Sequence, residues 1–199
     1  MSPVLTDWPA RTLTAVIRLL VSKLRLRAVL ARVSSPLAET DALTGAASRY
    51  RLERALQLEC ERARRFHQPF TVIAMDVDNF KQINDTYGHA TGDLVLQTFG
   101  MILLGRLRGS DQVGRIGGEE FAVLLTETNL KVGESVAEKL RRCIDGEPLI
   151  LDGGHTIFPS MSFGVGAPGA RHFKDLFQQV DKALYQAKNR GRNCVVVVE

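Results

Sequence analysis

Cysteine is scarce in this chain of 199 residues, and its placement excludes two common kinds of site. The three cysteines, Cys60, Cys143 and Cys194, are odd in number and far apart, and no Cys-x-x-Cys pair occurs. This spacing argues against a disulfide framework and against a zinc knuckle. It favours a reducing, cytoplasmic environment.

Long hydrophobic runs are also missing. Residues 10–33 are rich in leucine and valine, but Arg18, Lys23, Arg25 and Arg27 interrupt them. The segment therefore never reaches the ~18–20 consecutive apolar residues that a membrane span requires. Charges inside the apolar stretch also argue against a cleavable signal peptide.

The same segment has the spacing of a basic amphipathic helix, because Leu13, Ile17, Leu20 and Leu24 form one apolar stripe. Three roles stay open for it, ranked in this order: a dimerising helix, a helix lying on an anionic membrane surface, and a helix packed on its own domain. Ser34-Ser35-Pro36 ends it. We therefore divide the chain into an N-terminal helix and linker, residues 1–38, and a globular domain, residues 39–199.

The globular domain lacks the positive charge of a nucleic-acid-binding protein. Residues 1–38 hold six cations and one acid, so the net charge of +4 for the whole chain leaves −1 for residues 39–199. We therefore expect no nucleic-acid partner. A Ser-His-Asp or Cys-His arrangement is also missing, and His89 is the only histidine near the motifs described below.

Hydrophobic periodicity predicts an α+β domain. The order is helix, strand, helix, helix, hairpin, helix, strand, helix, strand, which favours a central sheet of mixed or largely antiparallel pairing surrounded by helices. Helices are predicted to about residue 65 and over residues 79–87, 92–107, 132–144 and 173–187. Strands are predicted over residues 70–75, 112–116, 121–125, 156–165 and 194–198, with a loop or small hairpin at 148–154.

Three acids stand out at strand ends. Asp76 and Asp78 follow the buried strand, and Glu119 follows the Gly117-Gly118 turn of the hairpin. Two unpaired carboxylates close together would repel, whereas a divalent cation removes the conflict. Oxygen ligands with room for phosphate and water suit Mg²⁺, and two such ions stabilise both oxygens of a phosphoryl transfer.

Four motifs occur in one order along the domain. They are Asp41-x-Leu43-Thr44-Gly45, Phe80-Lys81-x-x-Asn84-Asp85-x-x-Gly88-His89-x-x-Gly92-Asp93, Arg115-x-Gly117-Gly118-Glu119-Glu120-Phe121 and Ala187-Lys188-x-x-Gly191-Arg192-Asn193. Together they resemble the GGDEF family of diguanylate cyclases over about residues 40–199. The resemblance implies a fold similar to nucleotidyl cyclase and polymerase palm domains. It also implies conversion of two GTP molecules into cyclic di-GMP and two pyrophosphates.

The resemblance further implies a metal site and a hairpin that admits the nucleotide. Asp76 and Glu119 would ligate two Mg²⁺ ions, for which Mn²⁺ is expected to substitute, with help from the Val77 carbonyl. The Gly117-Gly118 backbone would make room for the nucleotide. Glu120 would help to activate or orient the attacking 3′-hydroxyl.

The remaining substrate contacts follow from the same resemblance. Asn84 and Asp93 would bind guanine, since a carboxylate accepts hydrogen bonds from N1–H and N2–H, a pair of donors that adenine lacks. Phe80 and Lys81 would line the phosphate site. Lys188 and Arg192, one helical turn apart, would bind the β- and γ-phosphates.

A second nucleotide site is implied by Arg108-x-x-Asp111, which stands shortly before the hairpin. In the family this pair forms an inhibitory site for cyclic di-GMP, and a guanidinium stacked on guanine explains the arginine. One departure concerns the first motif, where Ser48-Arg49 replaces the usual Asn-Arg and Ala46 and Ala47 are smaller than usual. We expect a looser turn between the N-terminal helix and the domain.

Each GGDEF site holds one GTP, so the product requires two domains facing each other as a homodimer, with residues 10–33 helping to join them. The alternative is a catalytically silent receptor for cyclic di-GMP or GTP that works through Arg108 and Asp111. No sensor domain is recognisable, so an upstream sensor or a partner is expected to supply the signal.

Overall fold

The computed structural model describes residues 39–151, 154–167 and 173–198 of the chain. The chain divides into two units, residues 1–38 and residues 39–199, and the description concerns the second. The predicted helix of residues 10–33 lies outside the described residues. Within them, every helix is too short or too polar to cross a bilayer.

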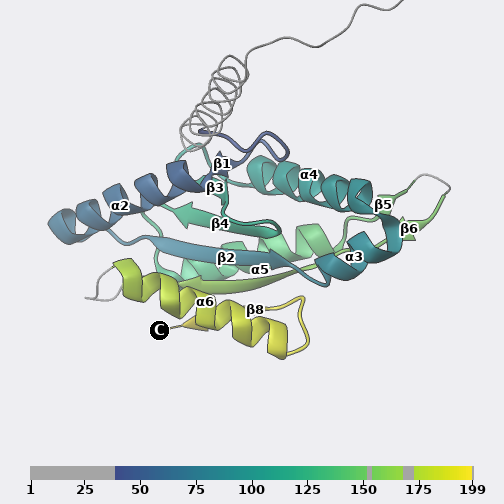
Figure 1. The fold of residues 1–199 in the computed structure, drawn as a ribbon. Coiled ribbons are helices and arrows are strands. Elements are labelled where there is room, and N and C mark those ends of the chain that lie inside the picture. Colours follow the sequence, from purple (N-terminus) through teal and green to yellow (C-terminus); the bar gives the residue numbers. More distant parts are fainter. Residues whose placement is uncertain (1–38, 152–153, 168–172, 199) are drawn as a thin grey trace, which may run out of the picture. The chain divides into compact units, whose positions relative to one another are not determined.

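The order of the longer helices and strands along the domain is the one that the sequence pattern predicts (Figure 1). The helices are α2 (Arg49–Phe66), α3 (Phe80–Tyr87), α4 (His89–Arg106), α5 (Leu130–Asp145) and α6 (Phe173–Asn189). The strands are β1 (Ala47–Ser48), β2 (Thr71–Val77), β3 (Gln112–Arg115), β4 (Glu120–Leu125), β5 (Leu149–Ile150), β6 (Thr156–Ile157), β7 (Met161–Gly166) and β8 (Val195–Val198).

The main sheet is mixed, with strand order β1-β3-β4-β2-β7-β8. The central pairs β3–β4, β4–β2 and β2–β7 are antiparallel, whereas the outer pairs β1–β3 and β7–β8 are parallel. The predicted α+β class with largely antiparallel pairing is therefore confirmed. Strand β2, which like β7 is buried along its whole length, lies at the centre of this sheet.

Two hydrophobic layers cover the two faces of the sheet, because successive residues of a strand point to opposite sides. On β2, Ile73, Met75 and Val77 belong to a core shared with α4 and α5, whereas Val72 and Ala74 belong to a core shared with α2 and α6. The helices contribute leucines and other apolar residues to these layers: Val95, Leu96, Phe99, Leu103, Ala137, Leu140 and Ile144 on one side, and Leu52, Leu56, Leu176, Val180 and Leu184 on the other.

One predicted strand is split in two. The run 156–165 forms β6, which pairs with β5 in a separate two-stranded sheet, and β7, which enters the main sheet. Phe158, Pro159 and Ser160 lie between them. Proline has no N–H to donate to a strand ladder, so pairing is interrupted there.

The described part of the first motif is closed by hydrogen bonds, whereas the N-terminal helix, to which a looser turn was expected, lies outside the described residues. Ser48 takes the N-cap position of α2, where its hydroxyl accepts a hydrogen bond from the Arg51 N–H at 3.3 Å. Serine is as effective as asparagine in this role. The turn before it is closed by backbone hydrogen bonds from Asp41 to Ala46 at 2.8 Å and from Gly45 to Asp41 at 2.9 Å.

The close approach of α6 to β7 leads to a stability prediction. A Cβ at Gly164 would lie 2.4 Å from the Val180 carbonyl oxygen and 2.5 Å from the Leu184 nitrogen, and backbone atoms cannot move aside easily. Gly164→Ala should therefore lower the free energy of unfolding by about 1–3 kcal/mol, measured by urea denaturation of the full chain.

Gly105→Ala is the matched control. It lies on the exposed side of α4, and no atom lies within 4 Å of its Cβ position. Alanine has the higher helix propensity, so this variant should gain up to about 1 kcal/mol. Equal stability of the two variants would contradict the close packing of α6 on β7.

Candidate active site

Asp76 lies one residue from the end of β2 and is the most buried of the acids predicted to bind metal. Its side chain is 7% exposed, and its Oδ2 lies 2.7 Å from the Nζ of Lys188. Lys188 stands in the last turn of α6. Because α6 packs along β2 and β7, it brings this lysine from the end of the chain to the end of the central strand.

The β3–β4 hairpin places two glutamates beside Asp76. Glu120 is the register partner of Asp76 across the β2–β4 pair, and the Val77 N–H donates to the Glu119 carbonyl oxygen at 3.2 Å. Directly opposed residues of an antiparallel pair share a face of the sheet. Asp76 and Glu120 are therefore neighbours on the α2–α6 face, and Glu119 follows the turn next to them.

Electrostatics show that these carboxylates crowd one another. Burial raises the pKa of Asp76, Lys188 opposes this shift, and the charges of Glu120 and Asp78 add to it. Burial also raises the pKa of Glu119, and the charge of Asp76 raises it further. One lysine thus faces several acids, so the site favours an additional cation.

The donor set fits a hard divalent cation. Asp76, Glu119 and the Val77 carbonyl supply only oxygen atoms, which is the ligand type that Mg²⁺ prefers. Among residues 39–151, 154–167 and 173–198, no group of three or more His, Cys, Asp or Glu side chains is arranged to hold a metal. The candidate ligands are therefore two carboxylates and a carbonyl, which leaves coordination positions for substrate oxygens and water.

The two glycines of the hairpin have different surroundings. A Cβ at Gly117 would lie 2.2 Å from Glu120 Oε2, so a larger residue would displace the Glu120 side chain. A Cβ at Gly118 would meet no atom within 4 Å. Gly117 thus makes room for Glu120, and Gly118 leaves open space beside the turn.

Arg115 holds the hairpin turn, a role that was not predicted from the sequence. Its Nε and Nη2 donate to the Gly118 carbonyl at 3.1 and 2.6 Å, and its Nη1 donates to both carboxylate oxygens of Asp41 at 3.2 and 3.3 Å. The first and third motifs are therefore in direct contact. The sequence does show an acid, Asp41, in the first motif and a cation, Arg115, in the third. It does not show that the two pair, because they are 74 residues apart.

Asp41 is bound from two sides. It accepts from the Thr44 N–H at 2.9 Å and from the Thr44 hydroxyl at 2.8 Å, in addition to Arg115. Burial alone would raise the pKa of Asp41, but the hydrogen bonds from Thr44 and Arg115 outweigh it and lower the pKa.

The residues predicted to bind guanine meet where α3 and α4 pack together. A Cβ at Gly92 would lie 2.0 Å from Asn84 Oδ1 and 3.1 Å from Phe80 Cζ, so the Asn84 amide rests on the backbone just before Asp93. Asp93 and Lys81 are exposed, whereas Phe80 is half-buried against the α4–α5 core. Within the described residues, no hydrogen bond or ion pair links Asn84, Asp93 or Arg192 to the Asp76–Lys188 pair.

The predicted spacing of Lys188 and Arg192 on one helix is wrong. Helix α6 ends at Asn189, Gly191 has φ 110°, and Arg192 itself has φ 67°. The Arg192 N–H donates to the Ala187 carbonyl at 3.1 Å, which closes the helix end. Arg192 therefore projects from the segment after the helix rather than from its last turn.

Arg108 and Asp111 lie in the turn between α4 and β3. The Asp111 carboxylate accepts from the Arg108 backbone N–H at 3.2 Å, and the Asp111 N–H donates to the Arg108 carbonyl at 3.0 Å. The Arg108 side chain is exposed. The structure thus brings the two residues of the predicted inhibitory site together.

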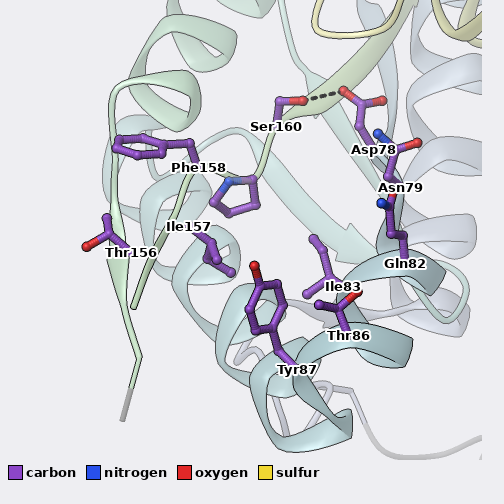
Figure 2. Close-up of a pocket in the computed structure, with 11 residues that line it drawn as sticks. Asp78, Asn79, Gln82, Ile83, Thr86, Tyr87, Thr156, Ile157, Phe158 and Ser160 are labelled. Atoms are coloured by element: carbon purple, nitrogen blue, oxygen red, sulfur yellow. Dashed lines mark hydrogen bonds between the residues drawn. The ribbon is translucent and has the colours of Figure 1, made fainter. Parts of the chain in front are cut away.

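A hollow of about 370 Å³ lies between α3 and residues 156–160 (Figure 2). Ile83 and Tyr87 of α3 face Ile157 and Phe158 across it, and Asp78 and Ser160 lie at one end. None of the residues predicted to bind nucleotide lines it. We therefore do not assign this hollow to the substrate.

Known proteins are similar to this chain in sequence and in fold. A family model described as "Diguanylate cyclase, GGDEF domain" matches residues 38–194. The diguanylate cyclase DgcS of Shewanella oneidensis is 37% identical over 155 residues, which are 77% of this chain and 51% of that protein. The chain thus spans about half the length of this curated relative.

Two solved structures are similar to the domain. The GGDEF domain of DgcB from Caulobacter crescentus, in complex with c-di-GMP, has a TM-score of 0.78 and 28% identity, covering 80% of this chain and 93% of that chain. The active GGEEF domain of a diguanylate cyclase from Vibrio cholerae has a TM-score of 0.71 and 31% identity, covering 76% and 97%.

The Asp41–Arg115 contact leads to a prediction about pH. The folded pKa of Asp41 lies below its ordinary value of 3.8, so its contribution to stability is present above pH 3.8 and is lost as the pH falls through the folded pKa. Asp41→Asn should lower the free energy of unfolding at pH 7 by about 1–3 kcal/mol. The difference from wild type should shrink below pH 3.8 in urea denaturation.

Glu53→Gln serves as the control, because its ion pair with Arg49 at 2.7 Å is largely exposed. Exposed pairs contribute at most about 1 kcal/mol. A pH-independent effect of Asp41→Asn, or an equal effect of Glu53→Gln, would contradict the stabilising role assigned to the Asp41 carboxylate.

Proposed function

The chain belongs to the GGDEF family of diguanylate cyclases, and we propose that it condenses two GTP molecules into cyclic di-GMP and two pyrophosphates. The observation that carries the proposal is the meeting of Asp76 with the Glu119-Glu120 hairpin and Lys188 at the end of β2. The same five hairpin letters occur in the active GGEEF domain from Vibrio cholerae. The glutamate at position 119 is therefore consistent with catalysis.

Guanine is the proposed base, bound by Asn84 and Asp93. Asn84 packs on Gly92, so its amide lies next to the residue whose carboxylate is exposed. The carboxylate oxygens can accept hydrogen bonds from guanine N1–H and N2–H, and the amide NH₂ can donate one to the guanine carbonyl oxygen. Adenine lacks this pair of donors, so GTP is favoured over ATP.

Cations from three parts of the chain are proposed to receive the triphosphate. Lys188 already lies 2.7 Å from Asp76, so its ammonium can bring phosphate oxygens beside the carboxylates. Arg192 and Lys81 are exposed and are proposed to contact the same phosphates, and Phe80 is half-buried beside Lys81. Arginine and lysine both pair with phosphate by charge-assisted hydrogen bonds.

Asp76, Glu119 and the Val77 carbonyl would hold Mg²⁺, for which Mn²⁺ is proposed to substitute, with two ions per site. A bound divalent cation would neutralise phosphate charge and lower the pKa of a hydroxyl next to it. Glu120, on the same face as Asp76, would orient the attacking 3′-hydroxyl and receive its proton.

Two sites must face each other, because each GTP provides one 3′-hydroxyl and one α-phosphorus. Each 3′-oxygen forms a bond to the α-phosphorus of the other nucleotide, and the bond to pyrophosphate breaks, which releases two pyrophosphates for one cyclic product. We therefore propose a homodimer as the active form. Residues 10–33 are proposed to help join the two copies, with contact to a membrane surface as the second role.

Cyclic di-GMP is proposed to inhibit the enzyme through Arg108 and Asp111. The Asp111 carboxylate is fixed by the Arg108 N–H, whereas the Arg108 guanidinium remains exposed and can stack on a guanine.

The described cysteines are all unpaired, which agrees with a cytoplasmic location. The activating signal is proposed to come from a sensor or a partner.

The catalytic assignment predicts the effect of two charge-neutral variants. Asp76→Asn and Glu119→Gln each remove one candidate metal ligand with little change in shape. Each should reduce cyclic di-GMP formation from GTP and Mg²⁺ at least about 100-fold, measured by chromatography of the products. Glu134→Gln, an exposed acid on α5, is the control and should retain wild-type turnover. Wild-type protein that forms no cyclic di-GMP but binds it would favour the silent receptor.

The inhibitory assignment predicts a different phenotype for Arg108→Ala. This variant should produce cyclic di-GMP at the initial wild-type rate but continue after the wild type slows, because the accumulated product no longer binds. Progress curves with GTP, and with ATP in parallel, provide the measurement. Little or no product is expected from ATP. An unchanged progress curve for Arg108→Ala would rule out inhibition through this residue.

A further inference from the structure

Asp78 is a buried acid that the proposed chemistry does not use. It lies two residues after Asp76, is 4% exposed, and accepts a hydrogen bond from Ser162 Oγ at 2.6 Å. A second comes from Ser160 Oγ at 2.7 Å (Figure 2). It also accepts from the Asn193 backbone N–H at 3.0 Å. A buried carboxylate is costly unless it is satisfied, and here three donors from two distant segments satisfy it.

Asn193 is held by its side chain as well as by its backbone. Its Oδ1 accepts from Arg141 Nη1 at 2.9 Å, and its Nδ2 donates to Asp145 Oδ1 at 2.7 Å. Both partners belong to α5. The residue also adopts the left-handed conformation, with φ 46°, which asparagine adopts more readily than most other non-glycine residues. Asn193 is therefore fixed between the end of β2 and helix α5.

The α5 side of this arrangement is itself rigid. Arg141 is paired with Glu138 through two hydrogen bonds of 2.9 Å, and Glu138 also accepts from Arg142 at 3.0 Å. The two arginines lower the pKa of Glu138 to about 2. The Arg141 guanidinium is thus oriented before it contacts Asn193.

Arg192 lies directly between this anchor and the end of α6. On one side its N–H bonds to the Ala187 carbonyl, next to Lys188, and on the other side Asn193 is bound to Asp78 and α5. Arg192 also has positive φ, 67°. A short segment with two consecutive left-handed residues would relax to other conformations if one end were released.

We propose that Asp78 and Asn193, together the Asp78–Asn193 clamp, are positioning residues that hold Arg192 and the end of α6 in the place where the triphosphate binds. The inference rests on the proposed function, in which Arg192 and Lys188 bind the β- and γ-phosphates. The clamp does not touch substrate. It fixes the backbone from which the arginine projects, so that Arg192 need not be ordered when the nucleotide binds.

Asn193→Ala tests the clamp without removing a buried charge. Binding should be measured by calorimetry with the α,β-methylene analogue of GTP, which cannot release pyrophosphate, and with GMP, which lacks the β- and γ-phosphates. The variant should lose at least about 10-fold in affinity for the triphosphate and less than about twofold for GMP. Asn189→Ala, an exposed asparagine at the end of α6, is the matched control and should bind both as the wild type does.

A double-mutant cycle with Arg192→Ala separates positioning from general destabilisation. If the clamp acts through Arg192, Asn193→Ala should cause less than about twofold further loss in the Arg192→Ala background. Full additivity, or equal loss for GMP and the triphosphate, would overturn the proposal. Asp78→Asn should give the same selective loss, with thermal melting as the check on folding.

The two proposals can fail separately. A wild-type chain that makes cyclic di-GMP while Asn193→Ala keeps wild-type triphosphate affinity refutes the clamp alone. If the wild-type chain makes no cyclic di-GMP, but Asn193→Ala selectively loses affinity for the triphosphate, the enzyme proposal is refuted and the clamp is supported. A wild-type chain that binds the triphosphate analogue no more tightly than GMP overturns the clamp as well.

Discussion

Repulsion among carboxylates at the end of β2 is the constraint on which the rest of the site depends. Asp76 is nearly buried, Glu120 is its cross-strand partner, and Glu119 follows the turn beside them. Burial and mutual repulsion raise the pKa of both Asp76 and Glu119, and Lys188 is the cation that reaches Asp76. Additional positive charge would relieve this repulsion, which suits a divalent cation.

The elements around this point keep the acids in place by contacts that are distant in sequence. Arg115 joins the hairpin turn to Asp41, and Asp78 joins the end of β2 to β7 and to the segment after α6. The hairpin and the C-terminal segment are therefore both tied to the same strand end. The turn at Asp41 and the hairpin turn at Gly118 are thus joined through one guanidinium.

Much of the fold was predictable because burial imposes a period on each element. The apolar run 70–75, the Gly-Gly hairpin and the spacing of Val132, Val136 and Leu140 correctly predicted β2, the β3–β4 pair and α5. Local pattern was misleading where a single residue interrupts pairing, as Pro159 does between β6 and β7. The two-residue strand β1 was missed, because it is very short and its strand partner, β3, lies far along the chain.

The sequence by itself determined the kind of chemistry. Acids at strand ends, a glycine turn and cations near the C-terminus occur at a spacing typical of one family. These residue types can be recognised in the sequence because the reaction requires them. Only the tertiary structure decided which groups meet: Lys188 with Asp76, Arg115 with Asp41, and Asn193 with Asp78. It also placed Arg192 beyond the end of α6 rather than one helical turn after Lys188. The physical reason is that hydrogen bonds and ion pairs act over a few ångströms, whereas these partners are 74 to 115 residues apart along the chain.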